Sequence, residues 1–245
     1  MCRRSAIVLI GLAATAIFIS KPGICPRCLA GELPDACPRT GRKLDGSKKS
    51  TPTQELAAVS AENNGFENLF TGEALKQWRQ CGPGQFVVSN GVATGEGGMG
   101  LWWYAGRQFT NFVLRGEFVQ EQEIADSGVF LRFPDPKDDP WKAVRQGHEM
   151  EIGDPDPKDP TWRTGSIYPF KSSIRANTKP VGQWNEYEIT CIGQDYSVRM
   201  NGEPIMSWTD PKKRATFGYI GLQNYNDGKT VRHRNVRIKE LPPSE

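Results

Sequence analysis

A chain of 245 residues with 26 glycines, 18 prolines and 10% aromatic residues is long enough for one sizeable domain or two small ones. Such a composition is typical of a turn-rich β protein. The formal net charge of +3 is unevenly spread, since residues 1–60 hold nine of the 31 basic residues and only four of the 28 acidic ones. The rest of the chain is slightly acidic, so its charge gives no argument for a nucleic-acid partner, and none is expected.

The N-terminal segment has the pattern of an export signal. Arg3 and Arg4 precede an apolar run from Ala6 to Ile19. This run is shorter than the roughly 20 residues that span a bilayer, and it predicts a signal peptide over residues 1–22. No clear small-x-small cleavage pattern follows, so an uncleaved anchor, with residues 6–20 as a membrane tether, stays open. Either alternative predicts an exported protein, periplasmic, extracellular or membrane-anchored.

Residues 23–64 are predicted to be a cysteine-containing tail followed by a flexible linker. Cys25, Cys28 and Cys37 stand close together, and a Cys-x-x-Cys pair can provide two of the four ligands of structural zinc. No second pair is near, so an incidental or disulfide-forming tail is favoured over a metal site. The residues after position 38 are polar, basic and small, as in linkers. The folded domain is expected over residues 65–242.

From residue 66 onward, short extended segments alternate with turns. Asn90-Gly91 and Asn201-Gly202 each stand between two β-prone runs and predict tight hairpins. In residues 111–121, alternation places Phe112, Leu114 and Phe118 on one face. About ten such strands with no long amphipathic helix predict an all-β fold, a two-sheet antiparallel sandwich of jelly-roll type.

A near-repeat interrupts this pattern. The segments PDPKDDPW (134–141) and PDPKDPTW (155–162) both end in tryptophan, at Trp141 and Trp162. Proline fixes φ and aspartate favours turns, so both segments are consistent with stiff solvated loops. They are equally consistent with the rims of a cleft, where the tryptophans stack on a sugar or the aspartates bind calcium. Because no calcium-loop spacing is matched, no metal is assigned, with calcium kept as a minor alternative.

The segment RQGHEMEIGD (145–154), between these two loops, places two carboxylates on one strand face. Alternation directs Met150 and Ile152 to the core, and Glu149 and Glu151 to the other side. Two residues apart on a strand is about 6.6 Å, within the spacing of paired acids in glycosidases. The same spacing occurs on any wet strand face. His148 falls on the core side and is interpreted as structural.

The preceding predicted strand, DSGVFLRF (126–133), contains an arginine that could lie beside Glu149 and Glu151. Regular alternation groups Gly128, Phe130 and Arg132 on one face. If the two strands are neighbours, Arg132 is expected beside the glutamates, where it could hold one carboxylate ionised and donate to a substrate oxygen. A plain cross-strand ion pair is the alternative.

Several segments from Phe66 to Leu241 resemble, in order and spacing, the 3-keto-disaccharide hydrolase domain, which has a concanavalin A-like lectin/glucanase fold. They are LFTGEALKQW, DSGVFLR, GHEMEIGD, TGSIY, KPVGQWNEYEITCIG, VRMNG and GYIGLQNYNDGKTVRHRNVRIKEL. The resemblance implies catalytic roles for Arg132, Glu149 and Asp154, with Glu151 as a further acid or base. Glu151 stands where the family often has glutamine, Tyr225 where a histidine is expected, and His233 at a position that is usually aromatic.

The resemblance implies a carbohydrate substrate, a 3-keto-glycoside, cleaved by acid/base chemistry either through elimination and hydration or through direct displacement. The expected surfaces for the sugar are Trp102, Trp103, Trp162, Tyr168, Gln223 and Tyr225. No cofactor is expected. Two other functions stay open, a non-catalytic carbohydrate-binding sandwich and a structural or adhesion module, because fold alone does not settle function.

Overall fold

The computed structural model describes residues 64–153, 158–225 and 228–243. The predicted signal or anchor, the cysteine tail and nearly all of the linker lie outside the described residues, as does Asp154. No helix in the described ranges is long and apolar enough to cross a membrane. Cys81 and Cys191, the cysteines within those ranges, are buried free thiols.

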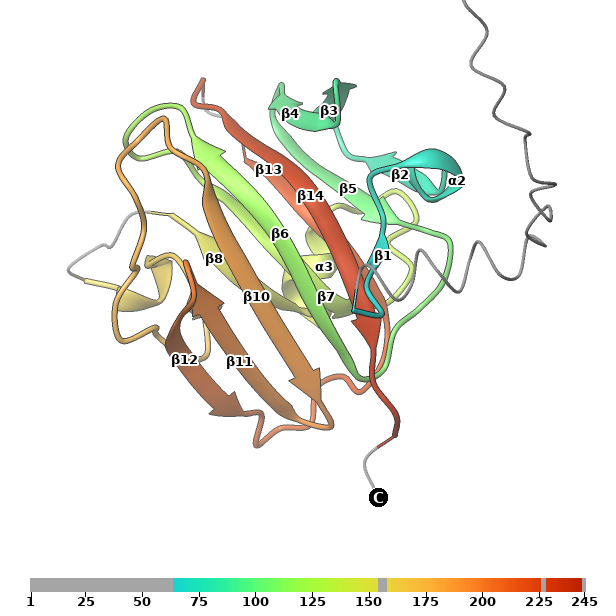
Figure 1. Cartoon of the computed structure of the whole chain (residues 1–245), viewed down its shortest axis with the longest axis vertical. Coiled ribbons are helices and arrows are strands. Elements are labelled where there is room, and N and C mark those ends of the chain that lie inside the picture. The colour runs from blue at the N-terminus through green and yellow to red at the C-terminus, as the bar shows by residue number, and fades with distance from the viewer. Residues whose placement is uncertain (1–63, 154–157, 226–227, 244–245) are drawn as a thin grey trace, which may run out of the picture. The chain divides into compact units, whose positions relative to one another are not determined.

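Two antiparallel sheets form the domain (Figure 1), which confirms the predicted sandwich. The first sheet runs in the order β12 (Glu203–Thr209), β11 (Asp195–Met200), β10 (Asn185–Ile192), β6 (Phe112–Gln120), β14 (Val231–Glu240), β4 (Val92–Glu96) and β3 (Gln85–Ser89), and the short β1 (Glu67–Asn68) also pairs with β14. The second sheet runs β2 (Trp78–Cys81), β5 (Met99–Tyr104), β13 (Tyr219–Tyr225), β7 (Ser127–Phe133), β8 (His148–Ile152) and β9 (Ile167–Tyr168).

Both predicted tight hairpins are present. Asn90 and Gly91, with φ of 51° and 75°, join β3 to β4, and Asn201 and Gly202, with φ of 51° and 84°, join β11 to β12. Two successive residues with positive φ match the twist of the flanking strands, which explains why Asn-Gly occupies both turns.

The main core fills the space between the two sheets. Phe112, Leu114 and Phe118 of β6 are fully buried there, as their alternation predicts. Met150 and Ile152 of β8 enter the same core from the second sheet. Burial of this two-sided apolar set is what holds the sheets face to face.

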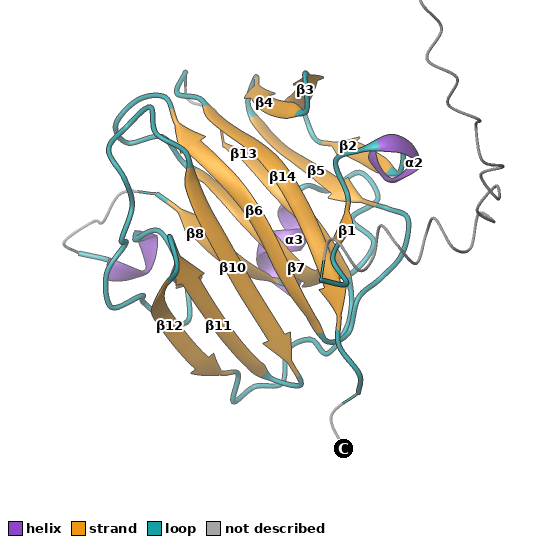
Figure 2. Ribbon diagram, in the orientation of Figure 1, coloured by secondary structure: helices purple, strands orange, loops and turns teal. Residues whose placement is uncertain are grey.

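Short helices accompany the strands (Figure 2): α2 (Gly72–Leu75), α3 (Trp141–Gln146) and the 3₁₀ turn η2 (Pro160–Trp162). In Figure 1, α3 lies behind the second sheet, on the side away from the first sheet. There Ala143 of α3 packs on Leu101, Phe130 and Phe133. The two predicted Pro-Asp loops are therefore partly helical, and the first of them, through α3, covers the outer face of the second sheet.

Candidate active site

Strand β8 directs Glu149 and Glu151 to the outer face of the second sheet, as alternation predicts. β8 pairs with β7 so that Phe130 is opposite Glu149 and Gly128 is opposite Glu151. The two glutamates are not on a wet surface, because only 3% of Glu149 and 6% of Glu151 is exposed. A pair of carboxylates is thus held in a recess of the sheet, where water solvates them poorly.

Gly128 gives Glu149 the space that it occupies. A Cβ atom built on Gly128 would lie 2.0 Å from Glu149 Oε1, closer than any real contact. The Glu149 carboxylate therefore lies over the bare backbone of β7. Its Oε1 atom is buried and has no hydrogen-bond partner within the described structure, and the same holds for Gln223 Oε1 from β13. Buried acceptors without a donor are costly, so both atoms are suited to receive hydrogen bonds from a ligand.

Glu149 and Gln223 both line one small pocket with a volume of about 150 Å³. Its lining is formed by Asp126, Trp141, Val144, Glu149, Glu151, Trp162, Tyr168, Gln223 and Tyr225. We call it the glutamate pocket. It combines a carboxylate floor with aromatic walls, the composition expected where a polar ring with apolar faces is bound.

Two edge-to-face aromatic pairs form the walls. The Trp141 and Tyr225 rings are 5.9 Å apart, and the Trp162 and Tyr168 rings are 6.5 Å apart. Trp141, Trp162 and Tyr225 are each about two-fifths exposed, at 40%, 44% and 41%. The two tryptophans that end the near-repeat therefore both line this pocket, in agreement with their interpretation as cleft rims.

Burial raises the pKa of both glutamates well above the ordinary value. For Glu149 desolvation is the main cause and the charge of Asp126 adds to it, whereas for Glu151 desolvation is followed by the charges of Glu149 and Asp126. Burial, then the charges of Asp159 and the two glutamates, also raises the pKa of Tyr168. The pocket thus holds two carboxyl groups that retain protons to higher pH than exposed ones, and a phenol that stays protonated.

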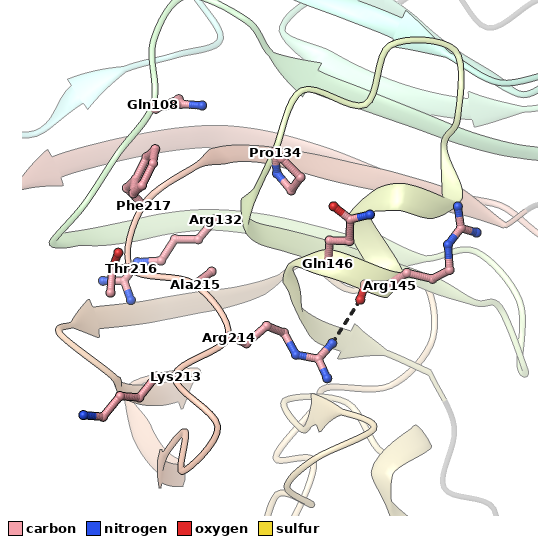
Figure 3. Close-up of a pocket in the computed structure, with 10 residues that line it drawn as sticks. All are labelled: Gln108, Arg132, Pro134, Arg145, Gln146, Lys213, Arg214, Ala215, Thr216 and Phe217. Atoms are coloured by element: carbon pink, nitrogen blue, oxygen red, sulfur yellow. Dashed lines mark hydrogen bonds between the residues drawn. The ribbon is translucent and has the colours of Figure 1, made fainter.

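The predicted placement of Arg132 beside the glutamates is wrong. β7 and β8 are neighbours, but the register of β7 against β13 shifts between Leu131 and Phe133, and Arg132 has a φ of 52°. This irregularity turns Arg132 out of the alternation. Its guanidinium donates to the carbonyl oxygens of Thr110 and Gly193 and to the Tyr196 hydroxyl. Figure 3 shows Arg132 in the lining of a different hollow.

Two of the tryptophans expected to contact sugar lie elsewhere. Trp102 is 5% exposed and packs in the main core, with its ring centroid 4.4 Å from that of Trp78. Trp103 lies on the outer face, where it packs edge-to-face on Tyr219 at 4.7 Å, and it does not line the glutamate pocket. Adjacent strand residues point to opposite faces, so Trp102 and Trp103 could not share one surface.

The sequence interpretation omitted Asp126 and Val144, which line the pocket. Val144 lies three residues after Trp141 on α3, so the two side chains share one face of the helix. Asp126 directly precedes β7 and lies two positions before Gly128. Recognising α3 as a helix would have found Val144.

His148 is a core residue, as interpreted. It is 1% exposed; its Nε2 lies 3.2 Å from Asp210 Oδ2, and its Nδ1 lies 3.1 Å from the Tyr196 hydroxyl. Desolvation lowers its pKa to about 4. Within the described ranges no group of three or more His, Cys, Asp or Glu side chains is arranged to hold a metal ion. Among the loop aspartates named as a minor calcium alternative, Asp156 lies outside those ranges.

Comparison with protein families supports the resemblance seen in the motifs. The model of the 3-keto-alpha-glucoside-1,2-lyase-like domain matches residues 65–239. The chain belongs to this family. Comparison with curated proteins found no match.

Solved structures similar to this family member share its fold. A proposed glycosyl hydrolase from Parabacteroides distasonis is 23% identical with a TM-score of 0.61, over 72% of this chain and 99% of that one. A second from the same organism is 19% identical with a TM-score of 0.62, over 74% and 96%. A Bacillus subtilis protein with a galectin-like fold is 12% identical with a TM-score of 0.52, over 73% and 96%. At these identities the likeness shows the sandwich fold alone.

Proposed function

We propose that this protein binds a carbohydrate in the glutamate pocket and cleaves the glycosidic bond of 3-keto-glycosides by acid/base chemistry. The observation that carries the proposal is the buried carboxylate pair, Glu149 and Glu151, with raised pKa values and an unpartnered Glu149 Oε1 at the floor of an aromatic-walled pocket. Proton-transfer groups work best with a pKa near the operating pH, which buried carboxyl groups approach. Membership of the lyase-like family supports the same chemistry.

The reaction proposed is an elimination followed by hydration. A ketone at C3 acidifies the C2 proton of the sugar, so that a carboxylate can remove it and form an enolate. Collapse of the enolate breaks the bond from C1 to the glycosidic oxygen, and that oxygen takes a proton from a carboxylic acid. Water then adds to the unsaturated ketone.

Glu149 is assigned the role of the base, and Glu151 that of the acid. Glu149 lines the pocket and its Oε1 atom has no hydrogen-bond partner among the described residues, which leaves that oxygen free to accept a proton. Besides burial, the charge of Glu149 helps to raise the pKa of its neighbour Glu151, so that Glu151 retains a proton to donate. Because two nearby carboxylates resist double ionisation, one holds a proton while the other accepts one.

Arg132 cannot stabilise the enolate, because its donors are used inside the sandwich. Pocket groups that can donate instead are the Tyr168 hydroxyl and the Gln223 side-chain amide. The raised pKa of Tyr168 keeps its proton in place for this role. A volume of about 150 Å³ is small beside the ~300–1,000 Å³ of typical ligand pockets, so the pocket suits one ring, with the aglycone against the exposed tryptophans.

Incubation with 3-keto-glucosides in deuterated water tests the assignment. The wild type is expected to release the aglycone and to exchange the C2 proton. Glu149→Gln should lose both activities, and Glu151→Gln should keep the exchange but release the aglycone slowly. Retention of the C2 proton during cleavage would exclude elimination and leave direct displacement, which two carboxylates can also perform.

A carbohydrate-binding sandwich without catalysis is the second candidate. It is favoured by Tyr225, which forms an aromatic wall at the position where the family is expected to carry histidine. In this case the wild type and Glu149→Gln bind oligosaccharides alike, and 3-keto-glycosides stay intact. The N-terminal arginines and apolar run support the added proposal that either activity takes place after export.

A further inference from the structure

A second, larger hollow lies across helix α3 from the glutamate pocket. Trp141 and Val144 of α3 line the glutamate pocket, whereas Arg145 and Gln146 at the end of the same helix line this other hollow. Its volume is about 500 Å³, within the ~300–1,000 Å³ range of sites for small ligands. The remaining lining comes from Gln108, Arg132, Pro134 and residues 213–217 (Figure 3). We call it the basic hollow.

The charge of the basic hollow is one-sided. Arg132, Arg145, Lys213 and Arg214 are part of its lining, and no acidic residue of the described chain is. Arg145 is neutralised, because its guanidinium forms an ion pair with Asp139. Neither Lys213 nor Arg214 forms an ion pair with any described residue. The lining therefore carries an excess of positive charge, and the nearby Asp210 carboxylate, which contacts His148, is not part of that lining.

Arg132 contributes a buried positive charge to the basic hollow. The side chain is 0% exposed, and its hydrogen-bond partners are neutral: the carbonyls of Thr110 and Gly193, the Tyr196 hydroxyl and the Asn111 amide oxygen. Buried charges in proteins are normally paired, since a guanidinium removed from water without a counter-charge is costly. A bound anion in the hollow would supply that counter-charge.

Arg214 is held where it can bind such an anion. Its Nη1 donates to the Arg145 carbonyl at 3.2 Å, and its guanidinium carbon is 4.0 Å from the centre of the Phe170 ring. The loop before it is fixed by Asp210, whose carboxylate accepts the backbone N–H groups of Lys212 and Arg214. Figure 3 shows the Arg214 guanidinium between the loop and α3. Its hydrogen bond within the described structure uses Nη1, so Nη2 and Nε can donate to a planar carboxylate.

The rest of the lining suits a sugar ring. Phe217 is 59% exposed, an unusual position for a phenylalanine, and it lies on the opposite side of the hollow from Gln146 (Figure 3). An exposed aromatic ring provides a flat surface for the apolar face of a pyranose. The Thr216 hydroxyl and the side-chain amides of Gln108 and Gln146 can exchange hydrogen bonds with ring hydroxyls.

We propose that the basic hollow binds the carboxylate-bearing ring of an acidic saccharide, with the carboxylate at Arg214 and the ring face on Phe217. The site is separate from the glutamate pocket and does not depend on cleavage there. A uronic-acid sugar meets both parts of the lining, whereas an inorganic anion meets only the cations and a neutral sugar only the ring and amides.

Calorimetric titration of the full-length protein with D-glucuronate, D-glucose and sodium sulfate tests this site. D-Glucuronate is expected to bind at least about tenfold more tightly than either of the other two, because only it satisfies both parts of the lining. Arg214→Gln and Phe217→Ala should each weaken glucuronate binding by about tenfold or more. Arg199→Gln, an exposed arginine of β11, and Glu149→Gln in the glutamate pocket should leave it unchanged.

Melting temperatures of the variants, measured by circular dichroism, separate loss of binding from loss of fold, and the exposed Phe217 offers a site whose change leaves the core intact. The proposal is overturned if glucuronate does not bind, or if D-glucose or sulfate binds as tightly as glucuronate. Unchanged affinity in Arg214→Gln, or loss of affinity in Glu149→Gln, overturns it as well.

Discussion

The Glu149 carboxylate lies directly over Gly128 of the neighbouring strand, so that a methyl group at Gly128 would come within 2.0 Å of Glu149 Oε1. The pair is diagonal across β7 and β8, and it exists because glycine leaves the outer face of β7 open. The position of Glu149, the candidate base, is thus possible because Gly128 has no side chain.

Gly128→Ala is expected to displace the Glu149 side chain and to lower 3-keto-glucoside cleavage by about tenfold or more. The clash is with the end of a flexible side chain, so the free energy of unfolding should change by less than about 1 kcal/mol. Kinetics and urea unfolding measure the two effects. The matched control is Gly116→Ala on β6 in the first sheet, where a Cβ would lie 2.2 Å from the hydroxyl oxygen of Tyr187 on the paired strand β10. It should reduce stability without a direct effect on the pocket, and equal activity losses in both variants would contradict this assignment.

Glu149→Gln is expected to stabilise the protein increasingly as pH rises. Burial raises the pKa of Glu149 above its ordinary 4.5, so the folded state holds a proton that the unfolded chain has lost. Unfolding then releases a proton, and the free energy of unfolding of the wild type falls as pH rises above 4.5, by about 1.4 kcal/mol per pH unit until the folded pKa is reached. Glutamine has no such penalty. Urea unfolding between about pH 4 and pH 8 measures the difference.

The control for that experiment is Glu96→Gln at the exposed end of β4. Its stability difference from the wild type should stay nearly constant over the same pH range. A constant difference for Glu149→Gln as well would show that the carboxylate is not buried in the folded state.

His233 is expected to have the opposite pH dependence. It is fully buried, and desolvation lowers its pKa from 6.5 to about 3. The unfolded chain binds a proton below pH 6.5 that the folded state refuses, so stability falls as pH drops from 6.5 toward 3. His233 lies next to the Phe86 ring. As pH falls through that window, the free energy of unfolding of His233→Phe should rise relative to that of the wild type by about 1.4 kcal/mol per pH unit. Chemical unfolding of both proteins at about pH 7, 6 and 5 measures this difference in the free energy of unfolding. A difference that does not change with pH would contradict the burial of His233.

Arg132→Met is expected to destabilise the fold by about 3 kcal/mol or more while leaving cleavage per folded molecule within about threefold of the wild type. The change leaves the carbonyls of Thr110 and Gly193 and the Tyr196 hydroxyl without their donor. Denaturant titration and active-site-normalised kinetics separate the two effects. The milder Tyr196→Phe removes one of these partners and should cost about 1–2 kcal/mol. A large loss of turnover in stable, folded Arg132→Met would restore the arginine to the reaction.

Trp162→Ala and Trp141→Ala are each expected to weaken saccharide binding by about 2- to 10-fold, as expected for an aromatic contact of about 0.5–1.5 kcal/mol. Both rings are partly exposed at the glutamate pocket, so their removal should hardly change stability. The control is Trp184→Ala, whose ring lies under Arg234 at 3.9 Å and outside the pocket. Calorimetry on the Glu149→Gln background avoids turnover, and unchanged affinities would exclude both walls from binding.

Much of the fold was predictable because its determinants are local. Asn-Gly pairs specify tight hairpins, and strict alternation in β6 and β8 specifies which face enters the core. The same alternation placed Glu149 and Glu151 together on the outer face. On the neighbouring strand β7, alternation predicted the wrong direction for Arg132. Arg132 itself has a positive φ, and the register against β13 shifts at this residue, so the side chains from Arg132 onward no longer follow the alternation.

The all-β architecture, the hairpins and the shared face of the two glutamates follow from the sequence, because these features depend on residues that are neighbours in the chain. Three other features depend on tertiary packing: this face is buried, Trp141 and Trp162 line one pocket over it, and Arg132 turns into the sandwich. They depend on α3 and β9, which contact β8, and on β13, which pairs with β7 and provides Gln223 and Tyr225 to the pocket. No local pattern encodes such packing, since burial of a carboxylate is a property of everything that surrounds it.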